Sequence, residues 1–205
     1  MMNPLFSLAD RLLASSRQMK AEQFAELAPK KGDIIFLGDS ITEGGLWSEW
    51  LPSLPVRNRG IDGDTTSGVL ARTRVAMGQE PAAVVLLIGT NDLSLGVPIS
   101  GIAANVRSIV REVRDQSPST HVILQSVMPR TPRRRRRLGS LNALLQVVAN
   151  EEGAEWLDLW PALQTPEGTL QPSMTADHLH LNGQGYRAWL TLLQPRLEQL
   201  AQSRA

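Results

Sequence analysis

The chain has 205 residues, of which 42% are hydrophobic and 20% charged, a composition that favours a folded globular protein and excludes a disordered one. Its 21 lysines and arginines almost cancel its 20 aspartates and glutamates, so no overall charge directs it to nucleic acid or to an anionic membrane. It has no cysteine, which excludes disulfides, thiolate metal sites and a cysteine nucleophile and agrees with a reducing compartment.

Neither a membrane span nor a signal peptide is recognisable in the sequence. The apolar run AAVVLLIG at 82–89 is far shorter than the roughly 20 residues that cross a bilayer. The N-terminal stretch contains an acidic residue and no basic residue before Arg11, unlike a secretory signal. We therefore expect a cytoplasmic protein that binds neither membrane nor nucleic acid.

The first predicted element is an amphipathic helix over residues 5–28, ended by Pro29. After it, short apolar strands alternate with amphipathic helices. The predicted strands cover residues 33–40, 55–61, 82–89, 121–127 and 154–160. The predicted helices cover residues 65–77, 99–115, 138–151 and 182–200, the last one bent or broken at Pro195.

This order of elements predicts a three-layer α/β/α sandwich around a five-stranded parallel sheet. No internal repeat and no change in composition marks a second domain, so we expect residues 1–205 to form one domain. The helix within residues 1–28 is predicted to pack on that domain. Two roles for it stay open, a cap on the sheet or a contact in a homodimer.

Polar loops follow the carboxyl ends of three predicted strands, at residues 38–40, 60–66 and 89–92. Ligands of open parallel sheets bind beyond the carboxyl ends of the strands. We therefore expect these three loops to meet at one edge of the sheet and to contain the chemistry.

Ser40 lies directly after the first predicted strand, at the expected start of a helix. A serine at this place is either a nucleophile or simply the N-cap of the helix. A serine nucleophile needs a base, and the chain has three histidines. His180 is the candidate, because Asp177 precedes it by one tight loop and could orient its imidazole. A structural loop hydrogen bond, or half of a metal site, is the alternative for this pair.

Two further positions could bind the oxyanion of an acyl-transfer reaction. The glycines of GIDGD at 60–64 allow a backbone N–H to approach a ligand closely. Asn91 offers a side-chain amide at the end of the third strand. An ordinary turn and an Asx-turn are the simpler interpretations of these two features.

Four blocks of the sequence, in this order, resemble the SGNH hydrolases, also called GDSL-type esterases and lipases. The blocks are IFLGDSIT at 35–42, NRGIDGDTTSGVLAR at 58–72, LLIGTNDLS at 86–94 and DHLHLNGQGY at 177–186. The resemblance implies a flavodoxin-like sheet and a catalytic triad of Ser40, His180 and Asp177. It also implies an oxyanion hole made by Ser40, Gly63 and Asn91, with no metal and no organic cofactor.

Within this family the chain resembles most the catalytic subunits of platelet-activating factor acetylhydrolase Ib and their bacterial relatives. The shared features are the second block, the Met-Pro-Arg at 128–130 and the N-terminal helix. Asp62 departs from the pattern, since that subgroup usually has glycine there, and it adds a charge near the expected pocket.

The implied activity is hydrolysis of small acyl esters, of acetyl type, through an acyl-enzyme intermediate. Sugar acetates and thioesters are alternative substrates for the same triad. A non-catalytic interaction protein of the same fold is a third hypothesis, and it predicts the loss of a catalytic group. All five site residues are present in this chain.

Five consecutive arginines, Arg133 to Arg137, interrupt this pattern. They form either a binding site for an acidic partner or phosphate, or a solvated turn and first helical turn. At the mouth of the pocket they would favour anionic esters. The tryptophans are expected in the core, although Trp47 and Trp50 could line an acyl pocket.

Overall fold

The computed structural model describes residues 4–204 and contains a sheet of five parallel strands in the order β2-β1-β3-β4-β5. The strands are β1 (Ile34–Gly38), β2 (Val56–Gly60), β3 (Ala83–Leu87), β4 (His121–Gln125) and β5 (Glu155–Leu157). This is the strand order of flavodoxin-like sheets, in which the chain reverses direction beside β1. The predicted fold class is therefore confirmed.

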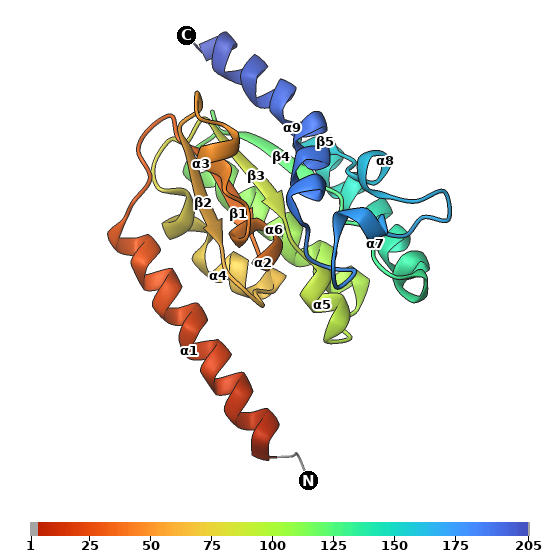
Figure 1. Cartoon of the computed structure of the whole chain (residues 1–205). Helices are drawn as coiled ribbons and strands as arrows, with labels where there is room; N and C mark the ends of the chain where they lie inside the picture. The colour runs from red at the N-terminus through yellow and green to blue at the C-terminus, as the bar shows by residue number, and fades with distance from the viewer. Residues whose placement is uncertain (1–3, 205) are drawn as a thin grey trace.

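Helices cover both faces of the sheet (Figure 1). One face packs against α4 (Thr66–Met77), α6 (Ile99–Gln116) and α7 (Pro132–Glu151). The other face packs against α2 (Ser40–Glu43), α3 (Trp47–Trp50), α8 (Trp160–Leu163) and α9 (Gly183–Arg204). Successive strand residues point to opposite faces, so strands buried on both faces are apolar throughout. The remaining helices are α1 (Pro4–Glu26), α5 (Thr90–Ser94) and the 3₁₀ turn η1 (Pro172–Met174).

Two predicted helix boundaries were wrong. Helix α7 starts at Pro132 and includes the whole arginine run, because proline is accommodated at a first helical position. The buried apolar residues of this helix begin only at Leu138. The hydrophobic pattern of the sequence therefore did not predict the first turns. Helix α9 continues through Pro195 to Arg204, so the proline does not end it.

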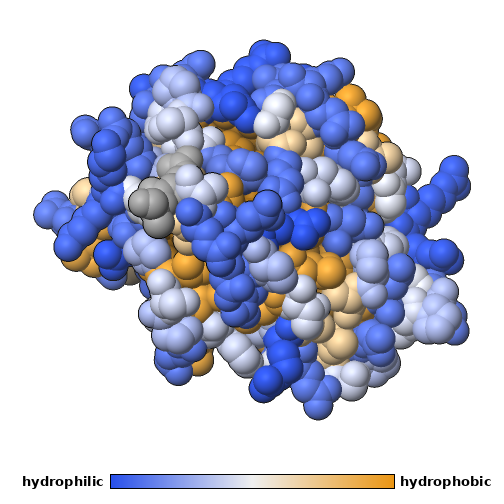
Figure 2. Space-filling view, turned by 90° about the horizontal axis from the view of Figure 1, so that it is seen from above, coloured by the Kyte–Doolittle hydropathy of each residue, from blue (hydrophilic) through white to orange (hydrophobic). Residues whose placement is uncertain are grey.

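The surface of the molecule is mainly polar. In the view of Figure 2 most of the surface is hydrophilic, with smaller hydrophobic patches between the polar side chains. Among residues 4–204, no helix combines the length and the hydrophobicity that crossing a bilayer requires.

Helix α1 projects from the rest of the molecule and packs against α4 near its C-terminal end (Figure 1). Phe24 anchors it, with 7% of its surface exposed. The guanidinium of Arg59 lies 4.6 Å from the centre of the Phe24 ring, and its Nη2 donates to the carbonyl of Leu27 at 2.6 Å. A homodimer contact through this helix stays a prediction.

We expect Phe24→Ala to lower the free energy of unfolding by about 3 kcal/mol, because it removes a buried ring and its cation–π contacts. Leu27→Ala is the matched control on the same segment, since Leu27 is 67% exposed and its truncation should change stability by less than about 0.5 kcal/mol. Urea unfolding of both variants measures the difference. Equal stabilities would show that Phe24 does not anchor the helix.

Candidate active site

Three loops leave the sheet at the same level. The register pairs Gly38 of β1 with Gly60 of β2 on one side and with Leu87 of β3 on the other. The chain segments after these residues therefore begin side by side. Helices α2 and α5, which follow β1 and β3, lie on this side of the sheet in Figure 1. The predicted convergence of the three polar loops is confirmed.

Ser40 opens α2 directly beyond β1. The turn before it is tightly packed, since a Cβ atom on Gly38 would overlap the Thr42 hydroxyl and the Leu87 carbonyl. Asp39 is extended and occupies the N-cap, where its carboxylate accepts from the Ile41 N–H at 3.0 Å. Asp39 is thus the N-cap, and the hydroxyl of Ser40 is left for another partner.

That partner is His180, whose Nε2 lies 3.0 Å from the Ser40 Oγ. The Nδ1 of the same ring lies 2.6 Å from an oxygen of Asp177. The other oxygen of Asp177 accepts from the N–H groups of Leu179 and His180, at 2.9 and 2.8 Å. These two bonds, with a φ of 60° at His178, fold the loop so that aspartate and imidazole face each other.

The Asp177 carboxylate stays ionised. The hydrogen bond from His180 and those from two backbone N–H groups hold its pKa well below the usual range. An ionised carboxylate accepts but does not donate, so Nδ1 of His180 carries the proton and Nε2 can accept from Ser40. The site is open to solvent, because the side chains of His180 and Asp177 are 46% and 52% exposed.

The other two histidines do not contribute to this chain of hydrogen bonds. His178 is exposed to solvent, one residue away from Asp177. His121 begins β4, at the opposite edge of the sheet, and lies 2.7 Å from Glu155. The histidine selected from the sequence is therefore the one that contacts Ser40.

The two predicted oxyanion loops are tied to each other. The Asn91 side-chain N–H donates to the carbonyl of Asp64 at 2.8 Å, and none of the described residues accepts from its second amide hydrogen. Gly63, just before Asp64, has a φ of 68°, a conformation that glycine adopts without strain. Among the residues whose side chains are described, none accepts a hydrogen bond from the N–H of Ser40 or of Gly63.

Arg72 of α4 connects these loops through its guanidinium. The sequence did not identify it as a site residue. It is buried, and its Nε donates to Asp64 at 2.8 Å. Its Nη1 and Nη2 donate to the carbonyls of Arg59 and Gly38, at 2.9 and 3.0 Å. It therefore binds the ends of β1 and β2 and the second loop. Arg72 lies within the quoted block 58–72, but only its contacts reveal this role.

Tyr186 was also missed as a site residue, although it closes the fourth block. Its hydroxyl donates to the Ile41 carbonyl at 2.7 Å, which ties the start of α9 to the helix that carries Ser40. The Trp47 indole lies between the Phe36 ring, at 4.2 Å, and the Tyr186 ring, at 5.7 Å. Trp47 is buried, so the hypothesis that it lines an acyl pocket is wrong.

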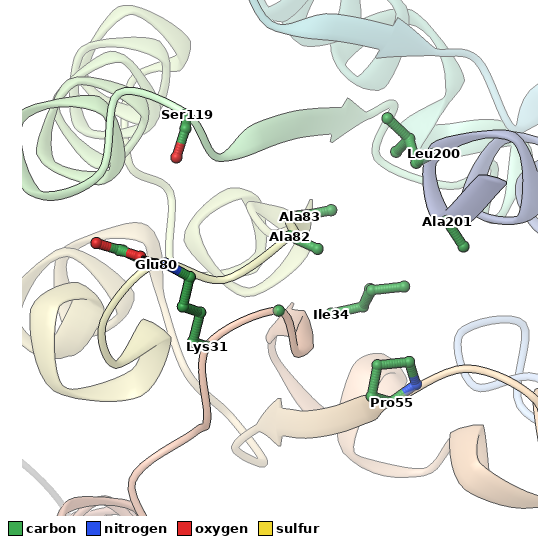
Figure 3. Close-up of a pocket in the computed structure, with 10 residues that line it drawn as sticks. Lys31, Ile34, Pro55, Glu80, Ala82, Ala83, Ser119, Leu200 and Ala201 are labelled. Atoms are coloured by element: carbon green, nitrogen blue, oxygen red, sulfur yellow. Dashed lines mark ion pairs between the residues drawn. The ribbon is translucent and has the colours of Figure 1, made fainter. Parts of the chain in front are cut away.

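A cavity of about 530 Å³ lies at the opposite edge of the sheet (Figure 3). Its walls come from the amino ends of β1 and β3, at Ile34 and Ala83, and from Leu200 and Ala201 of α9. It contains neither Ser40 nor His180. The hydrogen bonds that connect Ser40, His180 and Asp177 therefore lie outside this cavity.

Residues 36–188 match the GDSL-like lipase/acylhydrolase family. The chain belongs to this family. It is therefore a hydrolase of ester substrates, as the four sequence blocks predict. This hydrolase is 27% identical over 172 residues to the alpha1 subunit of platelet-activating factor acetylhydrolase IB from Bos taurus, covering 79% of this chain and 73% of that subunit.

Solved structures agree with this assignment. A candidate platelet activating factor protein from Streptococcus pneumonia superposes with a TM-score of 0.89 at 26% identity. The superposition covers 96% of this hydrolase and 100% of that chain. A GDSL-like lipase from Bacteroides thetaiotaomicron gives a TM-score of 0.74 at 26% identity, over 89% and 97% of the two chains. The predicted resemblance to the acetylhydrolase subgroup is confirmed.

Asp39 gives this GDSL hydrolase a buried carboxyl group directly beside Ser40. Burial raises its pKa from 3.8 to about 7, and the Ile41 N–H opposes this only in part. Between these pH values the unfolded chain releases the proton that the folded chain keeps. The contribution of Asp39 to stability is therefore fully present below about pH 4 and is lost as the pH rises through about 7.

We expect Asp39→Asn to be more stable than the wild type at pH 8, by on the order of 2–4 kcal/mol, because asparagine keeps the N-cap acceptor without the buried charge. The gain should disappear at pH 4. Urea unfolding at both pH values measures it, with the exposed Asp62→Asn as the control for loss of a carboxylate nearby. A gain that is the same at both pH values would contradict this interpretation of Asp39.

Proposed function

We propose that this ester hydrolase is a serine esterase that cleaves short, acetyl-type acyl esters through an acyl-enzyme intermediate. The observation that carries the proposal is the continuous chain of hydrogen bonds from Ser40 Oγ to His180 Nε2, at 3.0 Å, and from His180 Nδ1 to Asp177, at 2.6 Å. It lies beyond the carboxyl ends of the strands, where open parallel sheets bind their ligands.

In the first step the Ser40 oxygen attacks the ester carbonyl while His180 takes the hydroxyl proton. The ionised Asp177 stabilises the imidazolium that forms. The carbonyl oxygen becomes an oxyanion, for which the N–H groups of Ser40 and Gly63 and the free amide hydrogen of Asn91 are the available donors. The intermediate collapses to the acyl-serine, and the imidazolium returns its proton to the departing alcohol.

In the second step water replaces the alcohol. His180 takes a proton from water as it attacks the acyl-serine, and the same donors bind the second oxyanion. Collapse releases the carboxylic acid and returns the proton to Ser40. Apart from the ester and water, both steps use only groups of the chain itself.

The preference for small acyl groups has two supports. The Bos taurus relative is named as an acetylhydrolase, and the exposed His180 and Asp177 leave the site open to solvent. Sugar acetates and thioesters suit the same triad and belong in the same assay. Location in the cytoplasm stays a prediction.

We expect Ser40→Ala to lower hydrolysis of p-nitrophenyl acetate by about 10⁴-fold or more, because the acyl-enzyme cannot form. His180→Ala should cause a loss of similar size. The matched control is His178→Asn, at an exposed position two residues from His180, because asparagine tolerates the φ of 60° found there. Steady-state rates on p-nitrophenyl esters from acetate to octanoate measure the losses and the acyl preference.

The serine mechanism would be wrong if Ser40→Ala, still folded by circular dichroism, kept the rate of the wild type. A rate that increases with chain length up to octanoate would contradict the acetyl-type preference but not the mechanism.

We expect Asn91→Ala to lower kcat by about 10²–10³-fold with little change in KM, because the amide binds charge that develops only in the transition state. Asn105→Ala is the control for loss of a nearby amide, since Asn105 donates to Thr66 behind the same loop, at 2.9 Å. A loss that appears in KM alone would assign Asn91 to substrate binding instead.

A further inference from the structure

The arginine cluster, defined as Arg130 and Arg133 to Arg137, carries charge that the protein itself does not neutralise. Among the described side chains, no aspartate or glutamate forms an ion pair with any of these arginines. Other surface arginines are paired, as Arg107 and Arg111 are with Glu152. The cluster is therefore a local excess of positive charge on a chain whose net charge is only +1.

The position of this charge is unfavourable for the helix. The cluster opens α7, whose first turn has no acidic residue. A helix N-terminus carries partial positive charge, so each cation there is repelled by about 0.3–1 kcal/mol. A local rule broken without compensation within the fold is expected at functional sites.

Part of the cluster is bonded to α5 and to the loop that follows it. Arg134 Nη1 donates to the Leu93 carbonyl at 2.9 Å, and Arg137 Nη2 donates to the Val97 carbonyl at 2.8 Å. Arg133 and Arg136 are exposed. The cluster is therefore a positioned cationic surface rather than a flexible tail.

Arg130 links this surface to the catalytic edge. It follows β4, the neighbour of β3, and its Nη1 donates to the hydroxyls of Thr90 and Ser94, at 3.2 and 3.1 Å. Thr90 is the residue before Asn91. Burial and the charge of Arg134 lower the pKa of Arg130, while the charges of Asp177 and Asp39 oppose this.

Arg130 also has unused hydrogen-bonding capacity. Nη1 uses both of its hydrogens on Thr90 and Ser94. No acceptor for Nη2 is found among the described side chains and backbone. A guanidinium held on one side, with free N–H groups on the other, is suited to a carboxylate or a phosphate.

We propose that Arg130, supported by Arg133 to Arg137, binds the anionic group of the substrate, so that this esterase prefers esters that carry a carboxylate or a phosphate over neutral ones. This inference rests on the proposed serine esterase function and names the substrate class of the same site.

The test compares an anionic ester with a neutral ester of the same acyl group. 3-Acetoxypropionate and 2-acetoxyethyl phosphate are the anionic arms, which separate the two sources of charge, and 2-methoxyethyl acetate is the neutral arm. The readout is the ratio of kcat/KM, anionic over neutral, for each enzyme variant. Differences in intrinsic reactivity cancel when the ratios of two variants are compared.

We expect Arg130→Gln to lower this ratio by about 10- to 100-fold, as for loss of a hydrogen bond to a charged group, and Arg130→Lys to restore part of it. Arg130 also donates to Thr90, so Arg130→Gln could act through that contact. A double variant of two exposed arginines, which removes no internal hydrogen bond, controls for this effect. Arg133→Gln with Arg136→Gln should lower the ratio by about two- to fivefold, and this effect should weaken with salt. Arg111→Gln, a paired arginine on α6, should leave the ratio unchanged.

Binding gives a second readout that does not need turnover. In the Ser40→Ala background, isothermal titration should show 3-acetoxypropionate or 2-acetoxyethyl phosphate binding more weakly after Arg130→Gln. Equal ratios and equal binding with and without Arg130 would overturn the anionic preference while the esterase function stands. If the wild type cleaves none of the esters and binds no anionic ester, both proposals fall.

Discussion

The buried guanidinium of Arg72 connects the carboxyl ends of β1 and β2 to the loop that contains Asp64. Carbonyl groups at the ends of parallel strands lose their ladder partners, and a buried carbonyl without a donor is costly. Arg72 donates to the carbonyl of Arg59 and to that of Gly38, which also accepts from the Ile61 N–H at 3.1 Å, and it pairs with Asp64. The same side chain therefore connects the turn before Ser40 to the loop that contains Gly63 and Asp64.

His180 reaches this edge from the C-terminal part of the chain. Ser40 and His180 are 140 positions apart, and two features of the last segment bring them together. The turn around Asp177 orients the imidazole of His180, and the hydroxyl of Tyr186 donates to the Ile41 carbonyl in the helix that begins at Ser40. The core beneath, where the rings of Tyr186, Trp47 and Phe36 pack together, makes this attachment rigid. The geometry at the open surface is thus set by contacts inside the protein.

Charge is distributed unevenly across the site. Beneath the loops lie the buried carboxyl groups of Asp39, Asp64 and Asp92, and beside them stands the cationic arginine cluster. The net charge of +1 does not reveal this separation of negative and positive groups, because a net charge contains no information on where the charges lie. Buried carboxyl groups are tolerated when donors surround them, as the Thr66 N–H and hydroxyl surround Asp92. Among the described residues, no carboxylate pairs with the exposed Arg133 and Arg136.

The sequence by itself determined the fold class, because strands buried on both faces must be apolar throughout and helices beside them amphipathic. It also predicted that the loops of Ser40, Gly63 and Asn91 meet, since the loops after parallel strands share one edge. The partners of Ser40, His180 and Asp177, were predicted from their spacing and from the family resemblance. The tertiary structure alone decided the roles of Arg72, Tyr186 and Arg130. These residues act through contacts between segments far apart in the chain. Such contacts produce no repeating pattern of residues that could be recognised in the local sequence. The start of α7 belongs to the same class, because exposed arginines need no apolar stripe to be helical.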